Sequence, residues 1–179
     1  MLNKKSVIGI FAVVLFIVYY GTYLKMVNRG SVPQTLAANP VPDFKWQDFT
    51  DKTHDIKELS GKVVILHFWA TWCVPCRKEF PKLINAAKLL GDNVVFLTIS
   101  VDDDTKTADN FIAKLNIEKP NNLLFAIDKD RKIAFDIFQT VAYPETIIID
   151  TKQQMRQKFI GSVNWESEDN LGMIKSLLK

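Results

Sequence analysis

Apolar and polar positions alternate along this chain in blocks that differ in period. Short apolar runs rich in β-branched and aromatic residues predict buried strands, and they lie at residues 63–69, 94–99 and 123–127. Apolar residues spaced three or four apart predict helices, and they lie at residues 74–90, 105–116 and 165–178, with a helical turn near 131–139. Strands that alternate with helices are typical of an α/β fold with a central sheet.

Period-two patterns mark both ends of this predicted sheet. Phe44, Trp46 and Phe49 come before the polar pair Asp51 and Lys52, which predicts a β-hairpin, and a turn of helix follows up to residue 59. Towards the C-terminus, residues 146–150 and 155–160 read as two strands joined by a polar turn. The sheet is therefore expected to be mixed, with an antiparallel pair at the C-terminal end.

The N-terminal region predicts a membrane anchor. Residues 6–24 contain no charged side chain, and a helix of that length spans roughly 28 Å, close to the hydrocarbon thickness of a bilayer. A cleaved signal peptide needs a shorter apolar core and a nearby small-residue cleavage site, whereas the first candidate site is at residues 36–38. A lipoprotein anchor needs a cysteine directly after the run, and the first cysteine is Cys73. We therefore predict an uncleaved anchor at residues 1–24.

The next segment has the composition of a linker. Gly30, Pro33 and Pro40 interrupt residues 25–40, and no helical period is present. The predicted division of the chain is an anchor at 1–24, a linker at 25–40 and an α/β domain at 41–179.

Charge separates the N-terminal region from the domain. The chain carries 23 basic and 20 acidic residues, and four of the basic residues but no acidic ones lie in residues 1–40. The domain is close to neutral, so it lacks the basic surface that nucleic-acid binding requires. Lys4 and Lys5 oppose Lys25 and Arg29 across the predicted anchor, and with the terminal amine they favour a cytoplasmic N-terminus, which places the domain outside the cytoplasm.

Both cysteines of the chain lie in the sequence Cys73-Val74-Pro75-Cys76, between a predicted strand and a predicted helix. A thiolate rather than a thiol attacks a disulfide, and the N-terminus of a helix stabilises a thiolate. The three-residue spacing brings Cys76 to the same helix face as Cys73. We expect Cys73 to attack and Cys76 to resolve the resulting mixed disulfide. Pro75 is compatible with the first turn of the helix, because the backbone N–H that proline lacks would have no hydrogen-bond partner within the helix there.

Two other uses of the cysteines are less compatible with the sequence. A structural disulfide that closes so short a loop constrains the unfolded chain little. A zinc site needs two further ligands, and His54 and His67, the two histidines of the chain, have no zinc-finger spacing to the cysteines. Redox chemistry is therefore the favoured reading, and no metal site is expected.

The segment from Phe68 to Pro81 resembles the active site of thioredoxin-fold proteins, and most closely that of the membrane-anchored TlpA and ResA group. Further motifs follow in the family's order, at residues 42–44, 61–64, 100–102 and 144–150. The resemblance covers residues 41–179. It implies a thioredoxin fold, with a central mixed β-sheet flanked by helices, an added N-terminal β-hairpin and a central insertion. It also implies thiol–disulfide oxidoreductase activity outside the cytoplasm, with no cofactor other than the Cys73–Cys76 pair.

The resemblance also assigns roles to single residues. Pro144 matches the family's cis-proline, and the backbone of Tyr143 then pairs with an extended substrate. Trp72 covers the dithiol and meets the substrate together with Pro75. Glu145, in the sequence Pro-Glu-Thr, matches a glutamate near the dithiol in proteins of the CcmG (DsbE) type, and the alternative is an exposed loop glutamate.

Glu79 matches an acidic residue that tunes the dithiol in ResA-like proteins. Its carboxylate is expected to raise a thiol pKa or to take a proton from Cys76, and the alternative is a helix-surface charge.

Two features depart from the family pattern. His67 stands where relatives have aspartate or asparagine, and a hydrogen-bonded core histidine is favoured over a proton shuttle. Gln139 and Ala142 replace glycines before Pro144.

The sequence therefore predicts a dithiol reductase in the cytoplasmic membrane, with its domain on the extracytoplasmic side. By resemblance, a transmembrane thiol carrier of the CcdA or DsbD type supplies electrons, and the substrate is a protein disulfide, with apocytochrome c as one candidate. A protein oxidant of the same fold is the nearest alternative. A Sco-like copper protein is disfavoured because it uses a CxxxC spacing, and the peroxiredoxin motif is absent.

Overall fold

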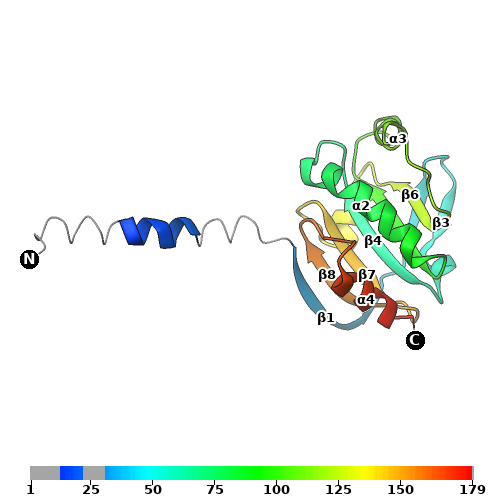
Figure 1. The fold of residues 1–179 in the computed structure, drawn as a ribbon. Helices are drawn as coiled ribbons and strands as arrows, with labels where there is room; N and C mark the ends of the chain where they lie inside the picture. Colours follow the sequence, from blue (N-terminus) through cyan, green and yellow to red (C-terminus); the bar gives the residue numbers. More distant parts are fainter. Residues whose placement is uncertain (1–12, 22–30, 179) are drawn as a thin grey trace, which may run out of the picture. The chain divides into compact units, whose positions relative to one another are not determined.

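The computed structural model describes residues 13–21 and 31–178. An eight-stranded mixed sheet organises the second of these parts, in the order β1-β8-β7-β4-β5-β6-β2-β3 (Figure 1). The strands are β1 (Val32–Pro40), β2 (Lys45–Asp48), β3 (Thr53–Asp55), β4 (Val63–Trp69), β5 (Val94–Ser100), β6 (Leu123–Ile127), β7 (Glu145–Ile149) and β8 (Gln154–Ile160). The helices are η1 (Ile56–Leu59), α2 (Val74–Leu90), α3 (Thr105–Lys114), the π-helix η2 (Lys132–Ile137) and α4 (Glu168–Ser176).

The predicted elements from residue 44 onward are all present. Strands β4, β5 and β6 are parallel, whereas β7 runs antiparallel to β4 and pairs with β8, as the C-terminal pattern predicts. The hairpin of β2 and β3 joins the sheet beside β6. The sheet and its helices confirm the predicted thioredoxin-like α/β fold.

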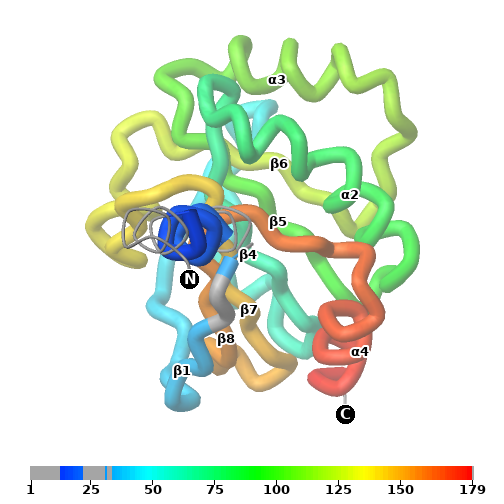
Figure 2. The backbone as a smooth tube through the Cα atoms, turned by 60° about the vertical axis from the view of Figure 1, so that its left-hand side comes forward, coloured from blue at the N-terminus to red at the C-terminus, as the bar shows by residue number. Residues whose placement is uncertain are grey.

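The two faces of the sheet are covered by different elements. Phe80 of α2 packs against His67 and Trp69 of β4, while Phe68, one residue along, packs against Phe138 after η2. Side chains of a strand alternate between faces, so α2 covers one face and η2 the other. Figure 2 shows α2 and α4 on one side of the sheet and the yellow segment that contains η2 on the other. β4 and β5 are buried along their whole length.

Residues 32–40 differ from the predicted linker. They form the edge strand β1, whose backbone pairs antiparallel with β8 from Val32↔Ile160 to Pro40↔Gln154, with an irregularity between Thr35 and Asn39. Proline and the small polar residues suggested a linker, but an edge strand tolerates proline because one side of its backbone has no partner. The folded unit accordingly begins at Ser31 rather than at residue 41.

Residues 13–21 form a helix that belongs to a separate unit of the chain. Within the described residues, no helix has the length and hydropathy that a membrane span requires. The remaining parts of the predicted anchor, and residues 25–30 of the predicted linker, lie outside the described residues.

Candidate active site

The two cysteines form a disulfide at the junction of β4 and α2. Cys73 is the N-cap of α2, and its Sγ accepts a hydrogen bond from the backbone N–H of Cys76 at 3.3 Å. Cys73 retains 5% of its surface exposed, whereas Cys76 retains none. Of the two cysteines, only Cys73 keeps any exposed surface. Pro75 lies in the exposed first turn.

An aromatic rim borders Cys73. Trp72 is 58% exposed, and its ring meets that of Tyr143 edge-on, with 5.8 Å between centroids. The Tyr143–Pro144 peptide bond is cis, as expected from the resemblance, and Pro144 is buried. The loop before β7 is thereby brought beside the loop that carries the dithiol.

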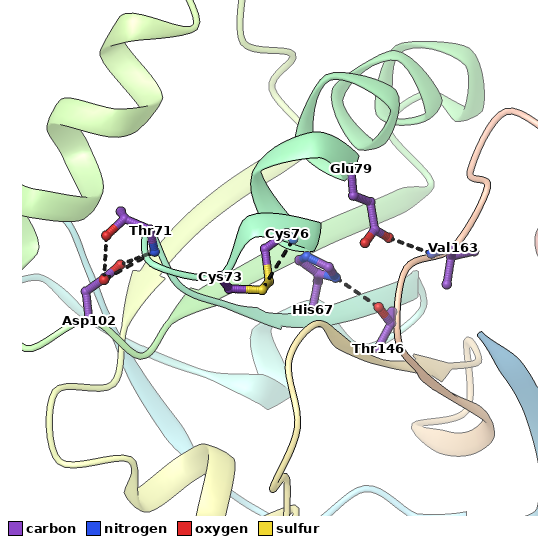
Figure 3. The surroundings of a disulfide bond; sticks show 8 residues. All are labelled: His67, Thr71, Cys73, Cys76, Glu79, Asp102, Thr146 and Val163. Atoms are coloured by element: carbon purple, nitrogen blue, oxygen red, sulfur yellow. Dashed lines mark hydrogen bonds between the residues drawn. A yellow bond between two sulfur atoms is a disulfide. The ribbon is translucent and has the colours of Figure 1, made fainter. Parts of the chain in front are cut away.

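Glu79 is buried on the inner face of α2, one turn after Cys76, with 4% of its surface exposed. Its Oε1 accepts a hydrogen bond from the backbone N–H of Val163 at 3.1 Å (Figure 3). The same oxygen accepts a second hydrogen bond from the indole N–H of Trp165. Its Oε2 has no protein partner among the described residues. Burial raises the pKa of this carboxyl to about 7, against the opposing effect of these hydrogen bonds. The alternative of a helix-surface charge is therefore wrong.

His67 lies on the face of β4 that α2 covers, and Figure 3 draws its ring beside Cys76. Its side chain is fully buried, and Nδ1 is 2.9 Å from the hydroxyl of Thr146. Its Nε2 has no hydrogen-bond partner within the described parts of the chain. Burial lowers the pKa of His67 to about 3, so the imidazole is neutral at physiological pH. The histidine is a hydrogen-bonded core residue, with one ring nitrogen left for other use.

Glu145 corrects the prediction made for it. It is the first residue of β7, where it pairs with Phe68 across the sheet and is 1% exposed. Its carboxylate accepts from the hydroxyl of Thr140 and forms an ion pair with Lys158 at 2.9 Å. It is thus neither an exposed loop residue nor open to a substrate. Because it shares a face with Phe68, it lies on the opposite side of the sheet from His67.

Asp102 is a structural residue of the site that has no predicted role in the sequence analysis. Its buried carboxylate accepts from the backbone N–H of Thr71 at 3.0 Å, from the Thr71 hydroxyl at 2.8 Å and from the hydroxyl of Ser100 at 2.7 Å. These bonds fix the loop between β4 and α2 (Figure 3). The signal in the sequence is its position just after β5, since β4 and β5 are parallel and end at the same edge of the sheet.

A second cluster of titratable groups lies in the β2–β3 hairpin. His54 bridges Asp48 at 3.0 Å and Glu58 at 3.1 Å and stacks on Trp46. The hydrogen bond with Asp48 raises the pKa of His54. Both ring nitrogens of His54 are already used in these contacts. Within residues 13–21 and 31–178, no three His, Cys, Asp or Glu side chains are arranged to hold a metal ion.

Comparison with known proteins agrees with this geometry. The family model described as Redoxin matches residues 36–174. The chain belongs to the Redoxin family. It is 30% identical over 165 residues to the thiol:disulfide interchange protein DsbE of Pseudomonas fluorescens biotype C, covering 90% of this chain and 87% of that protein. It is 28% identical to the thiol-disulfide oxidoreductase ResA of Bacillus subtilis (strain 168), covering 75% and 73%.

A solved structure shows the same fold. A DsbF homologue from Corynebacterium diphtheriae superimposes with a TM-score of 0.68 at 24% identity, covering 84% of this chain and 96% of that one. Family, fold and the paired cysteines together establish a thiol–disulfide oxidoreductase. In this redoxin, Cys76 is fully enclosed, Cys73 keeps a small exposed surface, and the side chains of Glu79 and His67 are buried on the same side of the sheet.

Proposed function

We propose that the chain is a membrane-tethered reductase of protein disulfides that acts outside the cytoplasm. The observation that carries the proposed chemistry is the enclosure of Cys76 one helical turn before the buried Glu79, whose pKa of about 7 lets it exchange protons near neutral pH. The uncharged stretch at residues 6–24 supports the tether. The kinship with DsbE and ResA supports an extracytoplasmic substrate.

The reaction needs only the two cysteines and a proton acceptor. The Cys73 thiolate, stabilised by the N-terminus of α2, attacks one sulfur of the client disulfide, whose S–S bond breaks. The departing client sulfur takes up a proton from solvent. The second client sulfur is now joined to Cys73 in a mixed disulfide.

Resolution follows inside the protein. The Cys76 thiol loses its proton to the Glu79 carboxylate, and the thiolate attacks Cys73. The bond between Cys73 and the client breaks, and the second client sulfur leaves as a thiolate that takes up a proton from solvent. The client is then a dithiol that has gained two electrons, and the Cys73–Cys76 disulfide has formed, as in the structure. A dithiol donor must then reduce that disulfide. We propose a transmembrane thiol carrier of the CcdA or DsbD type for this step, and apocytochrome c as a client.

Trapping of the mixed disulfide tests this sequence of steps. In Cys76→Ala, Cys73 can still attack the client disulfide, but no second thiol is present to release the client. The mixed disulfide between the client and Cys73 should therefore accumulate. Cys73→Ala is the matched control and should capture nothing. Non-reducing electrophoresis with mass spectrometry measures the adduct. If Cys73 of the Cys76→Ala variant reacts with alkylating reagents but forms no adduct with disulfide-bonded proteins, the proposed function is wrong.

A further inference from the structure

Exposed bulky apolar side chains gather around the dithiol. Within residues 34–178, most of those that are more than 40% exposed lie on the dithiol loop or on the segment that leads to the cis-proline, namely Trp72 at 58%, Val74 at 47%, Phe135 at 58% and Val141 at 79%. Leu89, at 62%, lies far from them, since about 24 Å of helix separates it from Cys73. A cluster of solvent-exposed apolar side chains on a protein surface marks a site of interaction.

A cavity of about 390 Å³ continues this surface away from Cys73. It is lined by Asp130, Arg131, Phe135, Thr140, Val141 and Tyr143. Tyr143 also meets Trp72 edge-on, so the cavity begins where the aromatic rim of the dithiol ends. The contact between Trp72 and Tyr143 therefore connects the dithiol loop with the lining of the cavity.

Two of the residues that line the cavity, Asp130 and Arg131, are charged, and both form ion pairs. Arg131 faces Asp103 at 3.7 Å, and Asp130 faces Lys132 at 3.3 Å. Each of these charges already has a partner of opposite sign. Phe135, Val141 and Tyr143 supply the remaining walls.

The walls of the cavity are held by buried bonds. Thr140 donates its backbone N–H to the carbonyl of Ala134 at 2.8 Å and its hydroxyl to Glu145. Lys158 bonds both Glu145, at 2.9 Å, and the carbonyl of Phe138, at 3.3 Å. η2 and the loop that follows it are thus tied to β7 and β8. A site formed in advance of binding needs less ordering when its ligand arrives.

We propose that this cavity binds a bulky apolar side chain of the client polypeptide, close in sequence to the cysteine that Cys73 attacks. The inference rests on the proposed function, because a mixed disulfide is what holds the client chain across the rim. An extended chain advances about 3.3 Å per residue, so a side chain within a few positions of the client cysteine reaches the cavity. The enzyme then selects clients by an apolar residue beside the disulfide.

Peptide disulfides test the proposal with the full-length reduced protein. Two sets of otherwise identical peptides carry either Phe or Ser at two, three or four positions on each side of a disulfide-bonded cysteine. At the best position, we expect Phe to raise the second-order rate of reduction roughly 10- to 100-fold, as expected for burial of one large apolar side chain. Oxidised glutathione, which lacks such a side chain, serves as the reference disulfide.

Variants of the cavity supply the second measurement. Phe135→Ser and Val141→Ser should bring the ratio of Phe to Ser peptide rates close to one, and Phe135→Met should keep most of the preference. Leu89→Ser is the matched control, exposed to a similar extent but distant, and should leave the ratio unchanged. Because these side chains are exposed, their replacement leaves the core intact.

The outcomes separate this inference from the proposed function. The cavity assignment is wrong if the wild type reduces Phe and Ser peptides at equal rates at every position, or if both serine variants keep the preference for Phe. In either case, reduction of the peptides still supports the reductase. If neither the peptides nor oxidised glutathione is reduced, the proposed function fails, and the inference fails with it.

Discussion

At the scale of single residues, the chemistry of Glu79 depends on the neighbours that bury it. Its spacing from Cys76 predicts a shared helix face, and that much is correct. The sequence could not reveal its burial, because the groups that cover it, Val163 and Trp165, come 84 and 86 residues later in the chain. Burial is what turns an ordinary glutamate into a group that exchanges protons near pH 7.

Glu79→Gln should slow release of the client from the mixed disulfide roughly 100-fold, as expected for loss of a general base. In the wild type the carboxylate accepts a proton only when ionised, so the release rate should fall as pH drops through about 7. In Glu79→Gln, the release rate should not show this fall near pH 7. Stopped-flow rates between pH 5 and 9 measure both effects.

Lys78→Gln, at the exposed neighbouring position, is the control and should behave as the wild type. An unchanged pH profile in Glu79→Gln would show that the carboxylate takes no proton from Cys76.

His67 should make the oxidised protein sensitive to acid. Burial lowers its pKa from the ordinary 6.5 to about 3, so between these values the unfolded chain binds a proton that the folded chain does not. Stability therefore decreases as pH falls from 6.5 towards 3, by up to about 5 kcal/mol from this group. Urea unfolding of wild type and His67→Asn at several pH values should give a shallower slope for the variant.

His54→Asn is the control for this measurement, because the pKa of His54 is shifted in the opposite direction, upward, by the hydrogen bond with Asp48. Equal slopes for the wild type and His67→Asn would mean that His67 is not a buried neutral imidazole.

Among the elements, the segment from η2 to β7 is predicted only in part from the sequence. The sequence places a helical turn there and a strand after Pro144, but it does not show that Glu145 turns away from the dithiol. The register of β7 against β4 sets that direction, and Lys158 in β8 pairs with the carboxylate on the same face of the sheet. Long-range pairing of this kind leaves no periodic signal in either strand.

Lys158→Met should leave the Glu145 carboxylate buried without its cation. Removing one partner of a buried ion pair costs about 3–5 kcal/mol, so the free energy of unfolding should fall by that amount. In the double variant with Glu145→Gln, much of the loss should be regained, because no unpaired charge remains. Urea denaturation of both variants and of Lys158→Arg, which keeps the charge, measures the coupling. A loss below 1 kcal/mol in Lys158→Met would show that the pair is solvated.

On the scale of the whole molecule, the sequence predicted the thioredoxin-like sheet well. Its central strands β4 and β5 are nearly continuous apolar runs, which is typical of parallel strands buried on both faces. The start of the folded unit was placed too late, at residue 41 instead of Ser31. β1 pairs through its backbone, and its described side chains are mostly exposed, so it lacks the apolar alternation by which strands are found in sequence.

Direction of electron flow is a property of the whole molecule, since it depends on the relative stability of the dithiol and the disulfide in this fold. The most direct measurement is the reduction potential of the Cys73–Cys76 couple in the full-length chain, equilibrated against glutathione or dithiothreitol. Thioredoxin and DsbA differ by roughly 150 mV, or about 7 kcal/mol for two electrons, so the result is decisive. A reductase predicts a value near the thioredoxin end of this range. A value near that of DsbA would make the protein an oxidant of thiols and contradict the proposed function.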